Sequence, residues 1–150
     1  MVKNDILIAG IKTRTTNNDS QAMADIGAMW QEFFSKNILS AIDDRVSNDI
    51  YLIYTNYESD YLGYYDAILG LQVSDFTGVA SGFFKHTIQA GKYKKYLAKG
   101  QLPDAVINVW KEIWKADVSL NRIYGSDFEI YTDKALNKQD AEVEIMIGIR

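Results

Sequence analysis

The sequence predicts an α+β fold in which a strand–helix–strand–strand unit occurs twice. Runs rich in β-forming residues alternate with two stretches of helical periodicity, in the order β-α-β-β and then β-α-β-β again. Each predicted helix carries a similar short motif, WQEFF at 30–34 and WKEIW at 110–114. The strand after each helix ends on Tyr-Thr, at 54–55 and at 131–132. These echoes indicate a duplication.

The first unit is expected within about residues 1–76. β-branched and aromatic residues mark its strands, apolar side chains at helical spacing mark its helix, and a glycine-bearing loop between two β-rich runs predicts a hairpin. The elements expected are a strand at 4–16, a helix covering 22–33, a connection at 37–49 that includes a helical turn, and hairpin strands at 50–57 and 65–74.

The second unit is expected within about residues 83–150, after a glycine-bearing break at 77–82. Pro103 is predicted as the first residue of its helix, where a missing N–H costs nothing. The elements expected are extended structure at 83–98 with a bend or bulge at Ala90–Gly91, a helix with Val106, Val109, Trp110 and Ile113 facing inward, and strands at 126–132 and 141–149. Because no proline-rich linker divides the units, we expect a single domain over 1–150.

Composition excludes several functional classes. The chain has no cysteine, which excludes disulfides, thiol nucleophiles and thiolate metal sites, and its one histidine, His86, is predicted to be a structural or surface residue. Asp60 and Asp66 flank a loop without metal-ligand spacing, so neither a metal nor a cofactor is expected. The net charge of −4 argues against nucleic-acid binding. The longest N-terminal apolar run, 6–11, is too short for a signal peptide or a membrane span, so we expect a cytoplasmic protein.

Glu129 is the most informative candidate for a functional residue. Strand alternation places it on one face with Asp127 and Tyr131, and glutamate is unusual in the middle of a strand. One interpretation is a carboxylate that faces solvent on a half-exposed sheet. The other is a carboxylate at the floor of an aromatic groove, where desolvation raises its pKa, with Tyr131 and Tyr54 as walls. The residues alone leave both interpretations open.

The tryptophans of the second helix are predicted to differ in role. Trp110 shares the inward stripe with Val106 and Ile113 and is expected in the core. Trp114 lies about 40° away around the helix and is a candidate for a groove between the helices.

Several segments resemble the gyrase-inhibitor-like (GyrI-like) family of effector-binding domains. The segment YTNYESDYLG at 54–63, followed by ILG at 68–70, resembles the middle of that family. IQAGKY at 88–93, followed by Gly100, resembles its central strand, although Gln89 stands where proline is common. Arg122 followed by DFEIY at 127–131 resembles its penultimate strand. The resemblance covers essentially the whole chain.

The resemblance implies a curved antiparallel sheet with two helices framing a groove. In drug-sensing members of the family, a glutamate at the position matching Glu129 faces cationic aromatic ligands. The resemblance therefore implies that Glu129 is a polar anchor and that Tyr131, Tyr54 and Trp114 are walls. Tyr57 is a weaker candidate, because its strand parity is opposite to that of Tyr54. No helix-turn-helix lies within the 150 residues, so a stand-alone member is expected.

Three functions follow from these expectations. The favoured one is a module that binds an amphipathic, cationic or planar aromatic molecule for sensing, sequestration or protection. The second is a hydrolase of cyclopropane-bearing DNA-alkylating natural products, in which Glu129 and Tyr54 or Tyr131 are catalytic. The third is a protein inhibitor that binds DNA gyrase, as the family's namesake does. Product formation would separate the first two functions.

Overall fold

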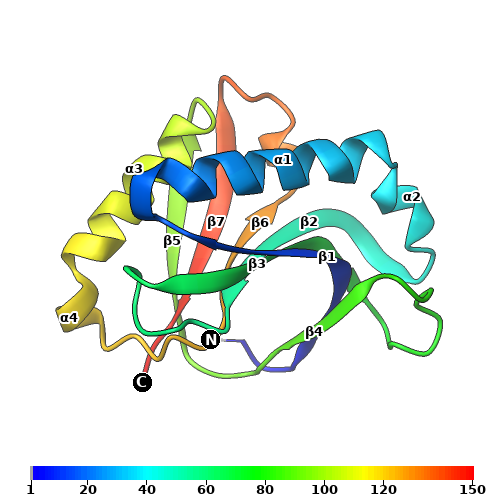
Figure 1. Cartoon of the computed structure of the whole chain (residues 1–150), viewed down its shortest axis with the longest axis horizontal. Helices are drawn as coiled ribbons and strands as arrows, with labels where there is room; N and C mark the ends of the chain where they lie inside the picture. The colour runs from blue at the N-terminus through cyan, green and yellow to red at the C-terminus, as the bar shows by residue number, and fades with distance from the viewer. Residues whose placement is uncertain (1) are drawn as a thin grey trace.

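The computed structural model describes residues 2–150 and arranges seven strands in one antiparallel sheet (Figure 1). The strand order is β4-β1-β3-β2-β6-β7-β5. The strands are β1 (Ile6–Thr16), β2 (Arg45–Thr55), β3 (Tyr64–Val73), β4 (Phe84–Ile88), β5 (Tyr93–Gly100), β6 (Asp127–Tyr131) and β7 (Ala141–Gly148). The helices are α1 (Gln21–Ser35), α2 (Ile38–Ala41), α3 (Asp104–Lys115) and α4 (Asp117–Leu120). The predicted α+β class is confirmed.

Apart from β4, which adds to the outer edge of β1, the strand order is mirrored about the pair formed by β2 and β6. The first unit supplies β1-β3-β2 and the second supplies β6-β7-β5, so the two β-α-β-β units meet at their middle strands. In that pair Tyr54 lies opposite Asp127, and Leu52 lies opposite Glu129. Since opposed residues share a face of the sheet, this register places Tyr54 and Glu129 on one face at its centre.

The two long helices cover that same face (Figure 1). α1 buries Met29 and Phe33 against the first unit, and α3 buries Val106, Trp110 and Ile113 against the second. Burial of side chains of this size contributes about 1.5–3 kcal/mol each, so packing fixes both helices on the sheet. Tyr54 and Tyr131 contact the apolar clusters under both helices.

The opposite face of the sheet is buried by the curvature of the sheet itself. Its core contains Ile8, Ile53, Ile68, Ile88 and Phe128, all with exposed fractions of 1% or less. His86 of β4 reaches across this face to Ser126, whose Oγ lies 3.0 Å from His86 Nε2. Burial lowers the pKa of His86. These contacts fit the structural role predicted for His86.

Three details differ from the sequence prediction. The run 83–98 forms two strands at opposite edges of the sheet, because β4 pairs with β1 and β5 pairs with β7. Gly91 therefore lies in the connection that crosses between the edges, where it exchanges two backbone hydrogen bonds with Val2. β2 begins at Arg45, within the stretch predicted as a connection. Pro103 immediately precedes the first residue of α3.

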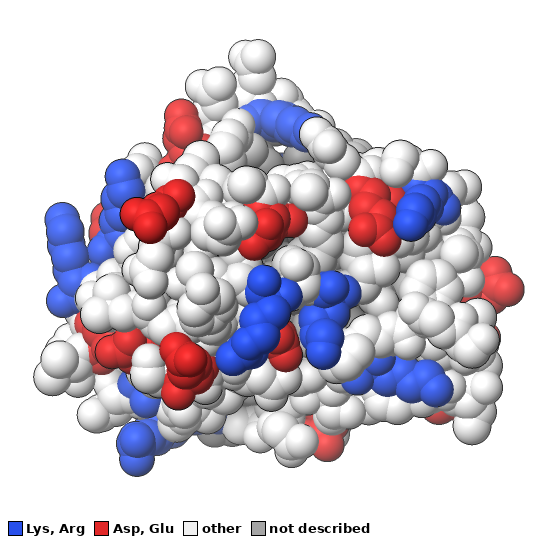
Figure 2. All heavy atoms as spheres, in the orientation of Figure 1, with Lys and Arg blue, Asp and Glu red and all other residues white. Residues whose placement is uncertain are grey.

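The surface that carries the two long helices has no extended patch of one charge. Acidic and basic side chains are interspersed on the face shown in Figure 2, with uncharged atoms between them. Within residues 2–150, no helix has both the length and the apolar character needed to cross a bilayer.

Candidate ligand-binding site

Glu129 lies at the centre of the helix-covered face, with an exposed fraction of 1%. Its carboxylate accepts three hydrogen bonds. Tyr54 Oη and Trp110 Nε1 each donate to Oε2 over 2.7 Å, and Tyr131 Oη donates to Oε1 over 2.5 Å. Of the two interpretations of Glu129, the geometry is that of a carboxylate on the floor between the helices and not of one facing solvent.

All three of these donors to Glu129 are neutral. Burial raises the pKa of Glu129, and the hydrogen bonds from Tyr131, Tyr54 and Trp110 oppose that rise without cancelling it. The pKa values of Tyr54 and Tyr131 are held well above 10, first by burial and then by the nearby Glu129 carboxylate. Both phenols therefore stay protonated and can donate at all physiological pH values.

Aromatic side chains enclose the Glu129 carboxylate from both helices. The ring of Trp30 in α1 packs edge-on against Tyr131 at 5.0 Å, and Tyr54 packs edge-on against Trp110 at 5.2 Å. Tyr65 of β3 adds a further ring at 5.6 Å from Tyr54. The predicted walls Tyr54 and Tyr131 thus touch the carboxylate directly. Glu129 is left with an exposed fraction of only 1% beneath these rings.

The two tryptophans of α3 contact the site to different extents. Trp110 is buried as expected, but its indole N–H also donates to Glu129. Trp114 stacks on Tyr61 with ring centroids 5.7 Å apart and lies 6.3 Å from Trp110. It therefore contacts the site through Trp110. A buried indole usually has an acceptor for its N–H. The sequence signal that could have predicted this contact was the acidic residue Glu129 in the strand below Trp110.

Tyr57 joins the same face in spite of its position in the sequence. Asn56 has a positive φ of 50°, which interrupts the strand alternation immediately after β2. Tyr57 Oη consequently donates to Asp127 Oδ2 over 2.6 Å. The parity argument against Tyr57 was wrong on orientation, although its partner is Asp127 and not Glu129.

Asp127 is the centre of a second buried polar group, which we term the Asp127 network. Besides Tyr57, its carboxylate accepts from Arg122 Nη2 over 2.8 Å and from the backbone N–H of Gly148 over 2.8 Å. Arg122 Nη1 also donates to Asp117 over 3.1 Å. The Arg122 guanidinium lies 4.2 Å from the centre of the Tyr124 ring. Sequence reasoning missed this network, which comprises Asp127, Arg122, Tyr57, Asp117 and Tyr124.

The remaining acidic candidates have local structural partners. Asp66 pairs with Arg14 at 3.0 Å and accepts from Asn56 over 2.8 Å. Asp60 accepts from the backbone N–H of Leu62 over 2.8 Å. In the part of the chain that the structure describes, no three histidine, cysteine or acidic residues are grouped so as to hold a metal ion.

Comparison with known proteins places this geometry in a family. Residues 2–149 match the family model described as Cass2, integron-associated effector binding protein. The chain belongs to the Cass2 family. Its GyrI-like fold agrees with the resemblance found in the sequence, and the family is described as effector binding.

Individual proteins match over most of the chain. A Bacillus subtilis (strain 168) protein named "Putative transcriptional regulator protein YobU" is 28% identical over 147 residues, which cover 95% of this chain and 91% of that protein. An integron cassette protein from the mobile metagenome of Vibrio cholerae has a TM-score of 0.77 and 30% identity, covering 100% of this chain and 94% of its own. The structure of SAV2435 bound to tetraphenylphosphonium has a TM-score of 0.82 and 18% identity, covering 100% and 92%.

Proposed function

We propose that this Cass2-family chain binds a small amphipathic aromatic cation and that Glu129 is the anchor. The observation behind the proposal is that, among residues 2–150, the buried Glu129 carboxylate has three neutral donors and no cationic one. A carboxylate out of water is costly to ionise unless a positive charge accompanies it. A cationic ligand supplies that charge, so binding and ionisation of Glu129 support each other.

The aromatic enclosure suits the apolar part of such a ligand. The rings of Trp30, Tyr54, Trp110 and Tyr131 provide faces and edges around Glu129, and aromatic faces attract cations, most strongly when both are desolvated. Tetraphenylphosphonium, the ligand of the fold neighbour SAV2435, combines a delocalised positive charge with four phenyl groups. This ligand supports the proposed chemical class.

Ligand entry requires rearrangement of these rings, because Glu129 is only 1% exposed in this structure. Trp30 and Tyr131 are only half-buried, which makes their side chains the ones freest to turn outward. The free energy needed to separate these two side chains weakens the observed binding of the ligand. We therefore expect ligand binding to change the environment of Trp30, which makes tryptophan fluorescence a suitable measurement.

One observation favours a second candidate function for the same residues. A carboxyl with a raised pKa beside two protonated phenols is an arrangement suited to general acid catalysis. In that case Glu129 would protonate a leaving group or activate water, and Tyr54 or Tyr131 would stabilise the developing oxyanion. A cyclopropane-bearing alkylator is the substrate class that tests this function.

The experiment is a fluorescence titration with tetraphenylphosphonium on wild type, Glu129→Gln and Glu112→Gln. Glu112 is an exposed residue of α3 and serves as the matched control. Saturable quenching is expected, with affinity reduced at least about thirtyfold in Glu129→Gln, since removing one member of a buried charge pair costs about 2–5 kcal/mol. The control should bind within about twofold of wild type, because surface charge changes are worth little.

Two outcomes would change the conclusion. Equal affinity in wild type and Glu129→Gln would remove Glu129 as the anchor. A cyclopropane-bearing alkylator recovered with one added water from wild type, but intact from Glu129→Gln, would make the protein a hydrolase.

A further inference from the structure

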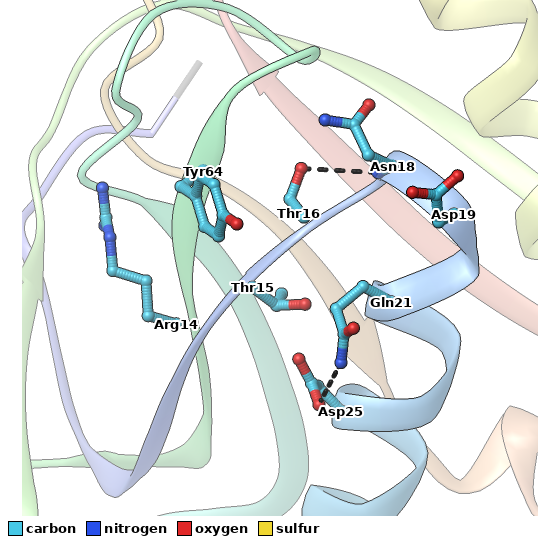
Figure 3. Close-up of a pocket in the computed structure, with 8 residues that line it drawn as sticks. All are labelled: Arg14, Thr15, Thr16, Asn18, Asp19, Gln21, Asp25 and Tyr64. Atoms are coloured by element: carbon cyan, nitrogen blue, oxygen red, sulfur yellow. Dashed lines mark hydrogen bonds between the residues drawn. The ribbon is translucent and has the colours of Figure 1, made fainter.

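A separate polar pocket opens where β1 ends and α1 begins (Figure 3). Its volume is about 400 Å³. It is lined by residues of four segments: the end of β1, the 3-10 turn Asn18–Ser20, the first turns of α1, and Tyr64 at the start of β3. Neither Glu129 nor any of its three donors lines it, so this pocket is distinct from the site proposed above.

The inner wall of this pocket contains a buried hydroxyl group without a partner. Thr15 has an exposed fraction of 1%, and its Oγ1 makes no hydrogen bond to any residue from 2 to 150. Figure 3 shows this hydroxyl directed towards the start of α1, where Gln21 donates to Asp25 Oδ1 over 3.0 Å. Buried polar groups in native proteins nearly always have a partner. An unpartnered hydroxyl in the wall of a pocket therefore indicates a ligand that can pair with it.

The charges around the pocket favour a cationic ligand. Arg14 is the basic residue of the lining, and its guanidinium is bound to Asp66 at 3.0 Å, outside the pocket. That leaves the carboxylates of Asp19 and Asp25. The start of α1 carries only about half a positive charge, and Asp19 lies beside it. The net field in the pocket is therefore negative.

The pocket is close to the Glu129 site and is separated from it by Tyr65. Thr15 lies opposite Tyr65 in the β1–β3 register, and the Tyr65 ring is 5.6 Å from Tyr54, which donates to Glu129. The pKa of Tyr65 is raised first by burial, then by Glu129 and then by Asp25. The Tyr65 hydroxyl therefore interacts electrostatically with the carboxylates of both Glu129 and Asp25.

We propose that this pocket is a second subsite, which takes a protonated primary amine carried by the same ligand whose aromatic cation Glu129 holds. An ammonium group donates three hydrogen bonds, and Asp25 and the Thr15 hydroxyl are the acceptors placed for it. The proposal rests on the proposed function of Glu129. It assigns to this chain a preference for dicationic ligands with an aromatic group at one end and an amine at the other.

The first test compares two series of phosphonium probes by calorimetry. One series is propyl-, hexyl- and nonyltriphenylphosphonium, and the other carries an amino group at the end of each tail. At the best tail length, the amino probe should bind wild type about two- to fivefold more tightly than its alkyl partner, as expected for a partly exposed ion pair. Asp25→Asn should abolish this advantage and leave the alkyl probes unchanged. Glu32→Gln, which removes an exposed carboxylate from the same helix, should retain the advantage.

Two results would overturn the proposal. One is an amino advantage that is absent at every tail length, and the other is an advantage that survives in Asp25→Asn. If Asp25→Asn weakens both series equally, Asp25 acts only through the general field, and the subsite is also refuted.

A second test does not depend on Glu129. Hexylamine alone, added to ¹⁵N-labelled protein, should shift the backbone amides of Thr15, Gln21 and Asp25 saturably, and Asp25→Asn should remove these shifts. If the phosphonium probes fail to bind but hexylamine shifts these amides, the aromatic-cation function is wrong and the amine subsite stands. If hexylamine shifts none of them, the subsite is wrong whatever the phosphonium probes do.

Discussion

Asp127 and Glu129 lie two residues apart on one strand, face the same side of the sheet and are both fully buried. Their partners differ. Asp127 is paired with the guanidinium of Arg122 as well as with neutral donors, whereas the donors to Glu129 are all neutral. The comparison separates a carboxylate whose charge is balanced within the fold from one whose charge, in the function proposed above, is balanced by a cationic ligand. The following predictions test that distinction.

The largest expected effect is on stability and comes from Arg122→Met. It leaves the Asp127 carboxylate buried without its counter-charge, which costs about 3–5 kcal/mol. Urea denaturation monitored by circular dichroism measures the loss. Arg150→Met, which removes an exposed C-terminal arginine, is the control and should change the stability by less than about 0.5 kcal/mol. A loss of that small size for Arg122→Met would mean that the Asp127 network does not stabilise the fold.

Tyr57→Phe should have the next largest effect. It deletes one hydroxyl that donates to Asp127, and a hydrogen bond to a charged group is worth about 1.5–3 kcal/mol. The free energy of unfolding should fall by about that amount, measured by the same denaturation. The affinity for tetraphenylphosphonium should stay within about twofold of wild type. A large loss of affinity would show that the two carboxylates are not functionally separate.

Unlike the two substitutions above, Glu129→Gln should make the protein more stable than wild type once the pH is above the acidic range. The folded-state pKa of Glu129 is raised, so the folded protein holds the proton more tightly than the unfolded chain, where the pKa is near 4.3. The stability that this group contributes is complete below that value. It is lost as the pH rises through the folded-state pKa, at up to about 1.4 kcal/mol per pH unit.

The measurement is a pair of denaturation series across that pH window. Wild type should lose stability relative to Glu129→Gln as the pH rises, and saturating tetraphenylphosphonium should restore it in wild type only. Parallel pH profiles for the two proteins would contradict a raised pKa.

Tyr131→Phe should have the smallest effect and is the matched counterpart of Tyr57→Phe. It removes the hydroxyl that donates to Glu129 Oε1, a bond that lowers the pKa of that carboxyl. The pH midpoint for cation binding should therefore rise. Affinities measured between pH 5 and 9 would show this shift, whereas an unchanged midpoint would mean that the Tyr131 hydroxyl does not influence ionisation of Glu129.

The centre of the site was predictable from the sequence because it follows strand geometry. Glu129 was identified as a poor strand former inside a β-rich run, and Tyr54 and Tyr131 by their matching positions in the two units. Strand alternation placed Glu129 and Tyr131 on one face, and the β2–β6 register brings Tyr54 beside them. Periodicity and duplication sufficed to select these three residues, whereas the burial of Glu129 was left open by the sequence and came from the structure.

The other parts of the site and fold could not be predicted, because they depend on features that leave no periodic pattern in the sequence. One positive φ at Asn56 turns Tyr57 to the other face, and a propensity argument does not locate such a residue. Arg122 lies outside any strand or long helix, so no pattern fixes its direction. Residues 83–98 are β-rich throughout, and only their long-range partners, β1 and β7, reveal that they form two strands.

Because the two units of the sheet meet where β2 pairs with β6, the candidate site lies across the boundary between them. Tyr54 and Glu129, hydrogen-bonded to each other, are 75 positions apart in the chain, and they come from opposite sides of that boundary. Neither half of the molecule can assemble the site alone, so ligand affinity reports on the correctly docked whole. A bound cation would act as a clamp between the halves. Its free energy of binding would appear as slowed hydrogen exchange of the β2 and β6 amides, the point at which the two halves would otherwise part.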